Sequence, residues 1–319
     1  MSFFQPAPGA VLSHVIADYP DGIVLPIDKP YRWTSADVIR KVKFAAFRHF
    51  RKKNLKVGHA GTLDPLATGV LLVCLGPACK RAQEFQDHDK EYVAGIRFGA
   101  TTPSYDLEKE VDRTFQYDRV TEEAVHAVLP SFLGPQEQVA PLFSAKSVDG
   151  VRAYEMARKL YRNAQKGVLD PDFDAAALET LHRSRITISE LELLGFVEAS
   201  AETPRTKIFS PEKRSKKFCP TPDADAACSE TVILSEAKES VSSTASSRIN
   251  VADTSSLGLP EARIRIACSK GTYIRAFARD LGEALGTGAH LSGLVRTKTG
   301  AFRLEDALSL EEALALLAD

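Results

Sequence analysis

The sequence predicts an α+β fold built on a mixed sheet. Segments with the alternating or β-branched pattern of strands occur among segments whose apolar residues follow helical spacing. They do not form the regular strand–helix–strand series of a parallel α/β sheet, so an α+β arrangement is favoured. The chain has 319 residues, of which 44% are hydrophobic and 26% charged, which is typical of a globular protein with a substantial core.

The N-terminal elements follow from short local signals. The apolar segment from Ile23 to Ile27 predicts a strand. Thr34 or Ser35 then caps a helix, because either hydroxyl can accept a hydrogen bond from a backbone amide of the first turn. This helix turns most of its basic residues outward, and its inward positions are Val38, Val42, Ala45 and Ala46.

The middle of the chain adds a strand and two helices. Glu91 to Phe98 alternates as a strand does. Thr121 opens a helix whose first turn holds two glutamates, which are favourable at the positive end of the helix dipole. Val151 to Leu160 has the pattern of a further helix.

Two more strands and two helices complete the prediction. Ile186 to Val197 and Ala262 to Cys268 have strand patterns. Thr272 starts a helix with apolar residues at positions 274, 277, 278, 281 and 285. Ser309 and Glu312 form a capping box for the last helix.

Residues 199–260 differ in composition from the rest of the chain. Their first part is basic, and the part from 220 to 250 is rich in Ser, Thr, Ala, Asp and Glu with few large apolar residues. Such a segment buries too little apolar surface to offset the entropy of ordering. We expect a low-complexity, flexible insertion between two strands of the sheet.

Charge and cysteine content limit the class of protein. The net charge of −1 excludes a bulk polycation, so any nucleic acid would bind to local patches. The five cysteines form no C-x-x-C pair, and no His/Cys/Asp cluster has metal-ligand spacing, so we expect reduced thiols and no metal. No segment has the pattern of a signal peptide or a membrane span, which favours a cytoplasmic protein.

A basic strip precedes a single acid. From Val38 to Leu63 the chain has no Asp or Glu, and the next residue is Asp64. One carboxylate beyond a strip that attracts phosphates suits chemistry on a nucleic acid, although an ordinary solvated helix face accounts for the strip equally well. The basic residues of the strip are Arg40, Lys41, Lys43, Arg48, Arg51, Lys52, Lys53 and Lys56.

A second segment gives Asp64 a partner. In residues 269–275 (SKGTYIR) a strand ends at a glycine and a helix begins, which places Tyr273 and Arg275 at the N-terminal turn of that helix. Arg275 can form an ion pair with Asp64. Taken one at a time, Asp64 is also explained as a turn residue, Tyr273 as a core aromatic and Arg275 as a surface cation.

Together these segments resemble the bacterial tRNA pseudouridine synthase B family, whose members convert uridine-55 of the tRNA T loop to pseudouridine. The resemblance covers about residues 22–198 and 261–315, with several separate motifs in the same order. The matching motifs are residues 58–69 (GHAGTLDPLATG), 270–275 (KGTYIR), 25–30 (LPIDKP), 90–93 (KEYV), 144–146 (SAK), 152–154 (RAY), and 288–291 (GAHL) through Arg296.

The resemblance implies a role for eight residues. Asp64 matches the family's catalytic aspartate, and Arg275 matches the arginine that pairs with it. Tyr92 matches the tyrosine that stacks on the flipped uracil, and Tyr273 one that packs against the target nucleotide. The remaining matches are Asp106, an acid near that arginine; His59, a histidine near the RNA loop; Leu294, a leucine lining the base pocket; and Lys80, a lysine near the cleft.

The resemblance also implies the architecture and the partners. It implies the pseudouridine synthase fold, with a central mixed, mainly antiparallel sheet flanked by helices and a catalytic domain over residues 22–315. The expected partner is the T arm of tRNA; we expect a monomer with no obligatory protein partner and no C-terminal domain of the PUA type. Phe143 departs from the family's usual tyrosine, and the lysine after Ser144-Ala145 is displaced by one position.

Pseudouridine formation involves no net redox change, so no cofactor is expected, and the chain has no phosphate loop or dinucleotide fingerprint. Whether Asp64 attacks the ribose or the base stays open.

Two alternative functions also stay open. Residues 61–64 (GTLD) resemble the first loop of haloacid-dehalogenase-like phosphatases, but Gly58 and Ala60 stand where that family has its Asp-x-Asp. A non-catalytic RNA-binding or RNA-folding protein would use the basic strip alone.

Overall fold

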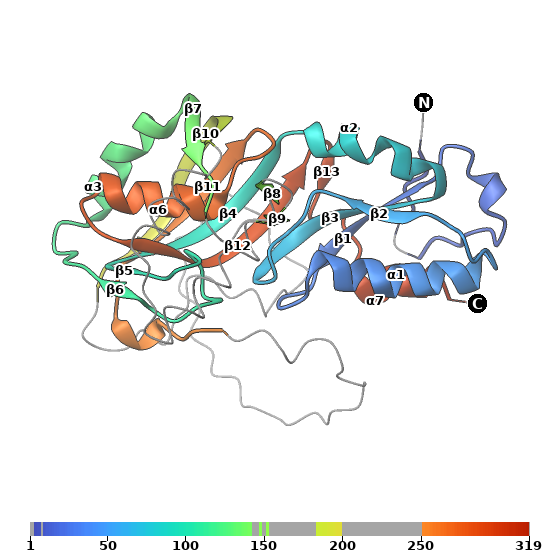
Figure 1. Cartoon of the computed structure of the whole chain (residues 1–319), viewed down its shortest axis with the longest axis horizontal. Helices are drawn as coiled ribbons and strands as arrows, with labels where there is room; N and C mark the ends of the chain where they lie inside the picture. The colour runs from blue at the N-terminus through green and yellow to red at the C-terminus, as the bar shows by residue number, and fades with distance from the viewer. Residues whose placement is uncertain are drawn as a thin grey trace, which may run out of the picture.

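A computed structural model describes residues 3–7, 9–141, 147–148, 151–152, 183–199 and 251–318. Over these residues the main element is a sheet with the strand order β1-β3-β12-β4-β11-β10-β7, to which β2 adds beside β3 and β13 beside β12 (Figure 1). The strands are β1 (Ile23–Lys29), β2 (Val57–Ala60), β3 (Ala67–Leu75), β4 (Lys90–Phe98), β7 (Gly134–Val139), β10 (Arg183–Val197), β11 (Glu261–Cys268), β12 (Ala289–Thr299) and β13 (Phe302–Arg303).

The α+β prediction is confirmed. Within this sheet β3 and β12 pair in parallel, and the other strand pairs are antiparallel. Two small hairpins lie outside it, namely β5 (Ala100–Thr101) with β6 (Arg113–Thr114) and β8 (Ser147–Val148) with β9 (Val151–Arg152). The α-helices are α1 (Ser35–His49), α2 (Ala82–Asp87), α3 (Glu122–Val128), α6 (Ile274–Ala284) and α7 (Leu310–Ala315), and the 3-10 helices are η1 (Ile16–Asp18), η2 (Gly76–Arg81), η3 (Leu129–Phe132) and η5 (Ser255–Leu257).

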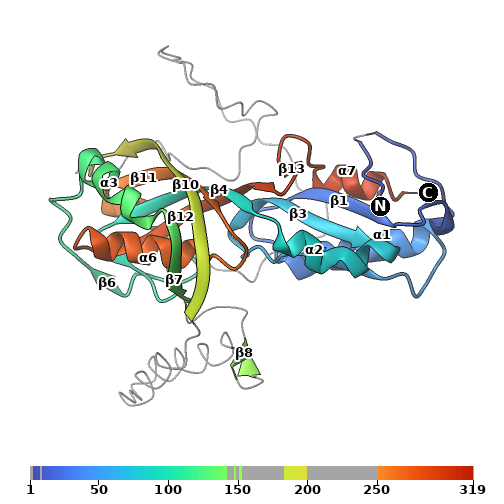
Figure 2. The same cartoon turned by 90° about the horizontal axis from the view of Figure 1, so that it is seen from above.

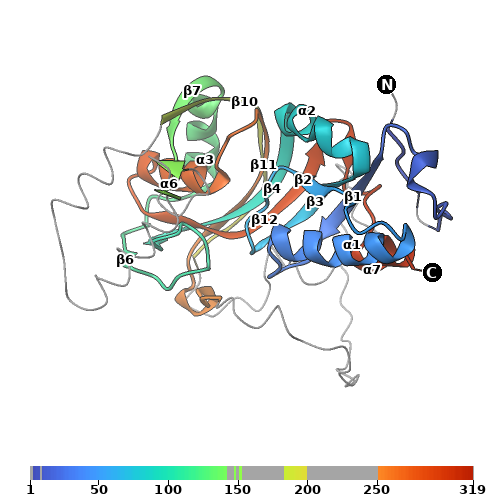
Figure 3. The same ribbon diagram turned by 45° about the vertical axis from the view of Figure 1, so that its right-hand side comes forward.

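Helices α1 and α6 lie on one face of the sheet (Figure 2), where their buried residues share one core. Helix α2 packs on the other face, where Phe85 belongs to a separate cluster with Val24 and Leu72. Helix α1 lies beside α7 at one end of the molecule (Figure 3). The apolar residues Val38, Val42 and Ala46 of α1 are fully buried, which confirms three of the four inward positions, whereas Ala45 is only half-buried. In α6, Phe277 and Leu281 belong to the same core.

Most of the predicted boundaries hold. Thr34 caps α1 and exchanges hydrogen bonds with Asp37, and Ser309 forms the expected capping box with Glu312. Thr121 caps α3 as predicted. The cap of α6 is Tyr273 rather than Thr272, and Tyr273 makes no capping hydrogen bond through its side chain.

The predicted helix from Val151 to Leu160 is wrong at its start. Val151–Arg152 is a strand that pairs with Ser147–Val148, so that Val148 faces Val151 across two intervening residues. The sequence between the two strands is Asp-Gly, one of the pairs favoured in short hairpin loops, and this signal competes with the apolar spacing that predicts a helix. Residues 153–160, the departures at 143–146 and the insertion from 200 to 250 lie outside the described residues.

The centre of the sheet determines where the loop bearing Asp64 emerges. Strand β3 is buried along its whole length. One of its edges pairs with β1; on the other, β2 covers Leu72–Leu75 and β12 pairs with Ala67–Gly69. The connection from β2 to β3, residues 61–66, therefore leaves the sheet at the junction of β2 and β12.

Candidate active site

Asp64 lies in a connection whose backbone is held from several sides. Ser35, the first residue of α1, donates its hydroxyl hydrogen to the carbonyl oxygen of Leu63 at 3.1 Å and accepts from the Leu63 amide at 3.0 Å. On the other side of Asp64, the carbonyl oxygen of Pro65 accepts from the amide of Arg32 at 3.0 Å. The direction of the Asp64 side chain is therefore set by neighbours in α1 and in the segment before it.

A buried lysine holds the C-terminal side of this loop. Lys29 is fully buried, and its Nζ donates to the carbonyl oxygens of Pro30, Trp33 and Pro65 at 2.9, 2.5 and 3.1 Å. Burial lowers the pKa of Lys29 to about 7, although the charge of Asp64 acts in the opposite direction. The ammonium thus joins the end of β1 to the residue that follows Asp64.

A buried arginine holds the N-terminal side. Arg296 on β12 is 1% exposed. Its guanidinium donates from Nε to Val70 O at 2.7 Å, from Nη2 to Gly61 O at 3.2 Å and from Nη1 to Thr62 O at 3.4 Å. Gly61 and Thr62 lie at the start of the β2–β3 connection, and Val70 lies in β3, beyond its end. Arg296 therefore fixes the distance between the two ends of the loop that carries Asp64.

Arg275 and two carboxylates form the charged centre of the site. The guanidinium of Arg275 is 5% exposed and donates to both carboxylate oxygens of Asp64, whose side chain is 38% exposed. Asp106 lies on the other side, 3.7 Å from Arg275 Nε, and accepts hydrogen bonds from the Ser104 hydroxyl and the Glu108 amide. Burial raises the pKa of Asp106, and the charge of Arg275 opposes this. Only Asp64 of this cluster is substantially open to solvent.

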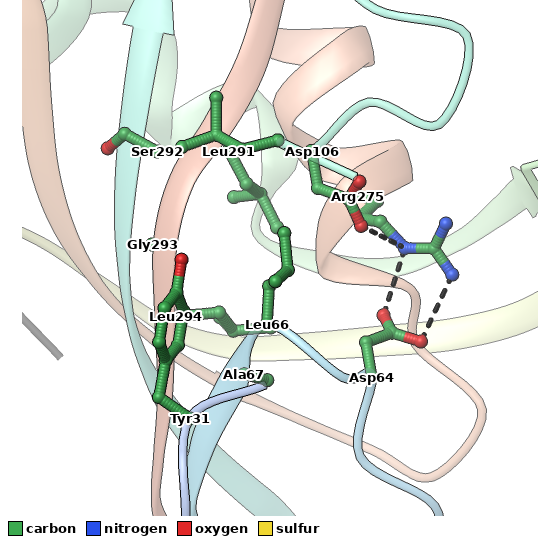
Figure 4. A pocket seen from close by; sticks show the side chains of 11 residues that line it. Tyr31, Asp64, Leu66, Ala67, Asp106, Arg275, Leu291, Ser292, Gly293 and Leu294 are labelled. Carbon is green, nitrogen blue, oxygen red and sulfur yellow. Dashed lines mark hydrogen bonds and ion pairs between the residues drawn. The ribbon is translucent and has the colours of Figure 1, made fainter. Parts of the chain in front are cut away.

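Asp64 and Arg275 border an open pocket with about 310 Å³ of empty space (Figure 4). Tyr31 and Leu294 stand across the pocket from Asp64, and Leu66 lies between. One wall is therefore charged and most of the rest is aromatic or aliphatic, which suits a flat, partly polar ligand. The lining residues are Tyr31, Asp64, Leu66, Ala67, Asp106, Leu107, Arg275, Leu291, Ser292, Gly293 and Leu294.

Four of the residues proposed from the sequence line this pocket, namely Asp64, Arg275, Asp106 and Leu294. The pairing of Asp64 with Arg275 is as expected. The two predicted tyrosines do not line it. Tyr92 is 9% exposed on β4, opposite Arg296 on β12, and burial raises the pKa of its phenol.

Tyr273, His59 and Lys80 do not line the pocket either. Tyr273 is held through its backbone, whose amide donates to Gln138 Oε1 at 2.8 Å and whose carbonyl accepts from Gln138 Nε2 at 3.1 Å. His59 is half-buried on β2, and burial lowers its pKa. Lys80 is exposed on η2.

Sequence reasoning missed Tyr31. This residue follows directly after the LPIDKP motif, which ends at Pro30, so it was not among the residues that the motif marked. Its neighbour Arg32 has a positive φ of 65°, a conformation that turns the chain sharply after the strand. The turn brings Tyr31 to the pocket, a placement that residue spacing alone does not predict.

The arrangement offers a carboxylate with fixed orientation beside a pocket with aromatic and aliphatic walls. A carboxylate can act as a nucleophile or a general base when it is positioned against its target. Among the described residues no group of three or more His, Cys, Asp or Glu side chains is placed to hold a metal ion. No helix in the same part of the chain is long and apolar enough to cross a membrane.

Two family models match the chain. The model of the TruB family pseudouridylate synthase N-terminal domain matches residues 48–168, and that of the tRNA pseudouridylate synthase B C-terminal domain matches residues 275–319. Between them they cover Asp64 and Arg275, the charged pair of the site.

Similar proteins occur in several bacteria. A Phocaeicola vulgatus protein named tRNA pseudouridine synthase B is 40% identical over 294 residues, which are 92% of each chain. A protein of the same name from Bacteroides thetaiotaomicron is 42% identical, again over 92% of each chain. One from Deinococcus radiodurans is 37% identical over 90% of this chain and 77% of its own.

A solved structure shares the fold. The chain superimposes on part of a Cbf5-Nop10-Gar1 complex with a TM-score of 0.51 and 22% identity. The match covers 92% of this chain and 54% of the other, so this chain spans about half the length of that neighbour.

Proposed function

The chain belongs to the TruB family of pseudouridylate synthases and is an isomerase that acts on tRNA, and from this premise we propose that it converts uridine-55 of the T loop with Asp64 as its catalytic residue. The observation that carries this assignment is the Asp64 carboxylate, held by two N–H groups of Arg275 at the edge of a pocket with an aromatic ring opposite. Because the chain belongs to the TruB family, it is not a haloacid-dehalogenase-like phosphatase, the alternative that residues 61–64 had suggested.

The reaction rearranges atoms without oxidation. The N1–C1′ glycosidic bond breaks, the uracil turns, and a C5–C1′ bond forms; the proton of C5 is lost and N1 gains one. The site must therefore hold a detached base and keep one carboxylate beside it. Attack by Asp64 on the ribose carbon or on the base fits this requirement equally well.

The pocket supports base flipping. A uridine in a folded T loop is stacked, so a base that reacts here must leave the stack and be held by apolar or aromatic surfaces. Tyr31, Leu66 and Leu294 supply such surfaces around the pocket. Tyr92 and Tyr273 flank this region from β4 and from the start of α6, and we assign them to substrate contact that requires the RNA to be bound.

The positions of the charged residues suggest a separate role for each. Arg275 fixes Asp64, and Asp106 fixes Arg275 from its other side. His59 and the exposed Lys80 do not line the pocket, and we assign them to contacts with the RNA loop and its phosphates. We further assign residues 22–315 to one catalytic domain that contains the insertion 199–260, and propose that the enzyme works in the cytoplasm as a monomer.

The test uses a T-arm stem-loop RNA labelled with tritium at C5 of the T-loop uridine. Because the reaction breaks the C5–H bond, tritium release reports turnover. We expect release with the wild-type protein and a loss of at least about 1,000-fold for Asp64→Asn, with the RNA still bound. The exposed Asp118→Asn variant is the matched control and should keep full activity.

An active Asp64→Asn protein would contradict the assigned role. Tight binding of the RNA by the wild type, with no tritium released and no pseudouridine in the recovered RNA, would favour the alternative of a non-catalytic RNA-binding protein. Light scattering of the purified protein tests the monomer.

A further inference from the structure

The exposed surface of α1 and of the segment after it carries eight cations, Arg40, Lys41, Lys43, Arg48, Arg51, Lys52, Lys53 and Lys56, which we call the α1 basic face. All eight side chains are exposed. Within the described chain Arg40 alone of these is in an ion pair, with Asp37 at 2.9 Å. Seven exposed cations close together repel one another, which costs stability unless an anion binds.

Two phenylalanines are interleaved with these cations. Phe44 is 65% exposed, and the guanidinium of Arg48 lies 5.9 Å from the centre of its ring. Lys43 Nζ lies 5.4 Å from the ring of Phe47. Single exposed apolar residues are ordinary. An exposed ring among cations, however, also offers a stacking surface beside phosphate-binding groups, which is how proteins bind unstacked nucleotides.

The α1 basic face begins next to the catalytic loop. Ser35, at the first turn of α1, is hydrogen-bonded to Leu63, the residue before Asp64. The 15 residues of α1 then extend for about 22 Å away from the loop. Helix α1 also lies on the same face of the sheet as α6, which carries Arg275 (Figure 2). An RNA with one nucleotide in the pocket is therefore within reach of the row of cations.

We propose that the α1 basic face is a second RNA-binding surface, which holds phosphates of the bound tRNA and packs Phe44 against a ribose or an unstacked base outside the uridine pocket. This inference rests on the proposed function, because it takes the same tRNA as its ligand. The face does not suit a membrane. The apolar side of α1 is buried against the core, so only Phe44 could enter a lipid layer.

The experiment compares two α1 variants with a matched control on full-length tRNA. In the first variant Lys41, Lys43 and Arg48 are replaced by Gln. In the control Arg113, Arg119 and Arg303, which are also exposed, are replaced by Gln, so that the change in net charge is identical. The second variant is Phe44→Ala. For each protein we would measure kcat, KM and the tRNA dissociation constant at several salt concentrations.

The α1 triple variant should raise KM and the dissociation constant about tenfold with kcat unchanged, and should lower the salt slope by about 2 to 3 units, one for each lost phosphate contact. Phe44→Ala should weaken binding about fivefold without changing the salt slope, because stacking releases no counterions. The control triple variant should bind as the wild type does.

Four outcomes would overturn the inference. The first is an unchanged KM and salt slope in the α1 triple variant, and the second is an equal loss in the control, which would indicate bulk charge. The third is a lowered kcat at unchanged KM. Binding of anionic phospholipid vesicles through these residues, with tRNA binding unaffected, would assign the face to membranes instead. None of these results touches the role of Asp64, which the Asp64→Asn assay tests separately. Circular dichroism and thermal unfolding confirm that each variant is folded.

Discussion

Arg275 holds both carboxylate oxygens of Asp64, a residue 211 positions earlier in the chain: Nε donates to Oδ2 at 2.9 Å and Nη2 to Oδ1 at 3.2 Å. A third donor, Nη1, binds the carbonyl oxygen of Ser104 at 3.1 Å. Since the guanidinium is planar and buried, these bonds fix the plane of the carboxylate as well as its position. The pair therefore determines which face of the Asp64 carboxylate is turned to the pocket.

Arg275→Lys should lower kcat by about 100-fold, because an ammonium keeps the charge but cannot hold two oxygens in a fixed plane. The KM for T-arm RNA should change little, since the pocket walls stay in place. Single-turnover kinetics measure the chemical step. Arg119→Lys is the control, because Arg119 is exposed. Full activity of Arg275→Lys would mean that charge alone orients Asp64.

Tyr31→Ala should reduce kcat/KM by about 10- to 100-fold, because it removes the aromatic wall opposite Asp64, and stacking of a base on an aromatic ring is worth about 1–3 kcal/mol. Tyr31→Phe keeps the ring and should retain most of the activity. Tritium release over a range of RNA concentrations gives both values. Equal activity of Tyr31→Ala and the wild type would remove Tyr31 from the substrate site.

The sequence led to the charged pair but not to the whole pocket. Asp64 and Arg275 stood out because each lies in a distinctive motif, and the ion pair follows from their chemistry. Tyr31 was not identified, because its position depends on the backbone turn at Arg32, which no pattern in the sequence predicts. The resemblance implies that Tyr92 stacks on the uracil; the structure shows this residue in β4 with 9% of its surface exposed, and its contact with the substrate stays a proposal.

The supports of the loop were also beyond the reach of sequence reasoning. Cations are rarely fully buried, so Lys29 and Arg296 would be expected at the surface. Both are instead surrounded by backbone carbonyls, which only the folded chain brings together. The predicted strands match β1, β4, β10 and β11, because burial of β-branched and apolar residues leaves a strong local pattern. No strand was predicted at β3 or β12, the strands that border the loop of Asp64, nor at β2, β7 or β13, and hairpin β8–β9 was missed because its strands are two residues long.

Gly69→Ala should prevent folding or lower the free energy of unfolding by more than about 3 kcal/mol. Gly69 has a φ of 100°, and an added Cβ would lie 2.2 Å from the carbonyl oxygen of Arg296, where β3 pairs with β12. Neither backbone can move without breaking this parallel pair. Urea unfolding followed by circular dichroism measures the loss.

Gly58→Ala is the matched control from the same motif. A Cβ at Gly58 would meet no atom within 4 Å, and its φ lies outside the left-handed region. We therefore expect a change within about 1 kcal/mol. If Gly69→Ala were as stable as Gly58→Ala, the close approach of β3 to β12 would not limit this position.

Acid stability should depend on His290, which is fully buried on β12. Its Nδ1 lies 2.9 Å from the carbonyl oxygen of Ala100, which can only accept, so Nδ1 carries the hydrogen. Its Nε2 then accepts from the hydroxyl of Thr254, whose oxygen accepts from Arg97 Nη1 at 2.7 Å. A proton on Nε2 would reverse the hydrogen bond between Nε2 and Thr254. Burial, the largest cause, lowers the pKa of His290 to about 4.

Because the folded pKa of His290 is below the value of about 6.5 expected in the unfolded chain, the unfolded state takes up the proton first as the pH falls. The stability that His290 contributes is complete above pH 6.5 and decreases as the pH falls towards 4. Between pH 7 and pH 5 the loss should be about 2 kcal/mol. Urea unfolding at both pH values measures it. His290→Gln, which stays neutral, should lose about 2 kcal/mol less than the wild type over the same interval, whatever its stability at pH 7. An equal loss in both proteins would mean that the pKa of His290 is the same in the folded and unfolded states, so that other groups govern acid unfolding.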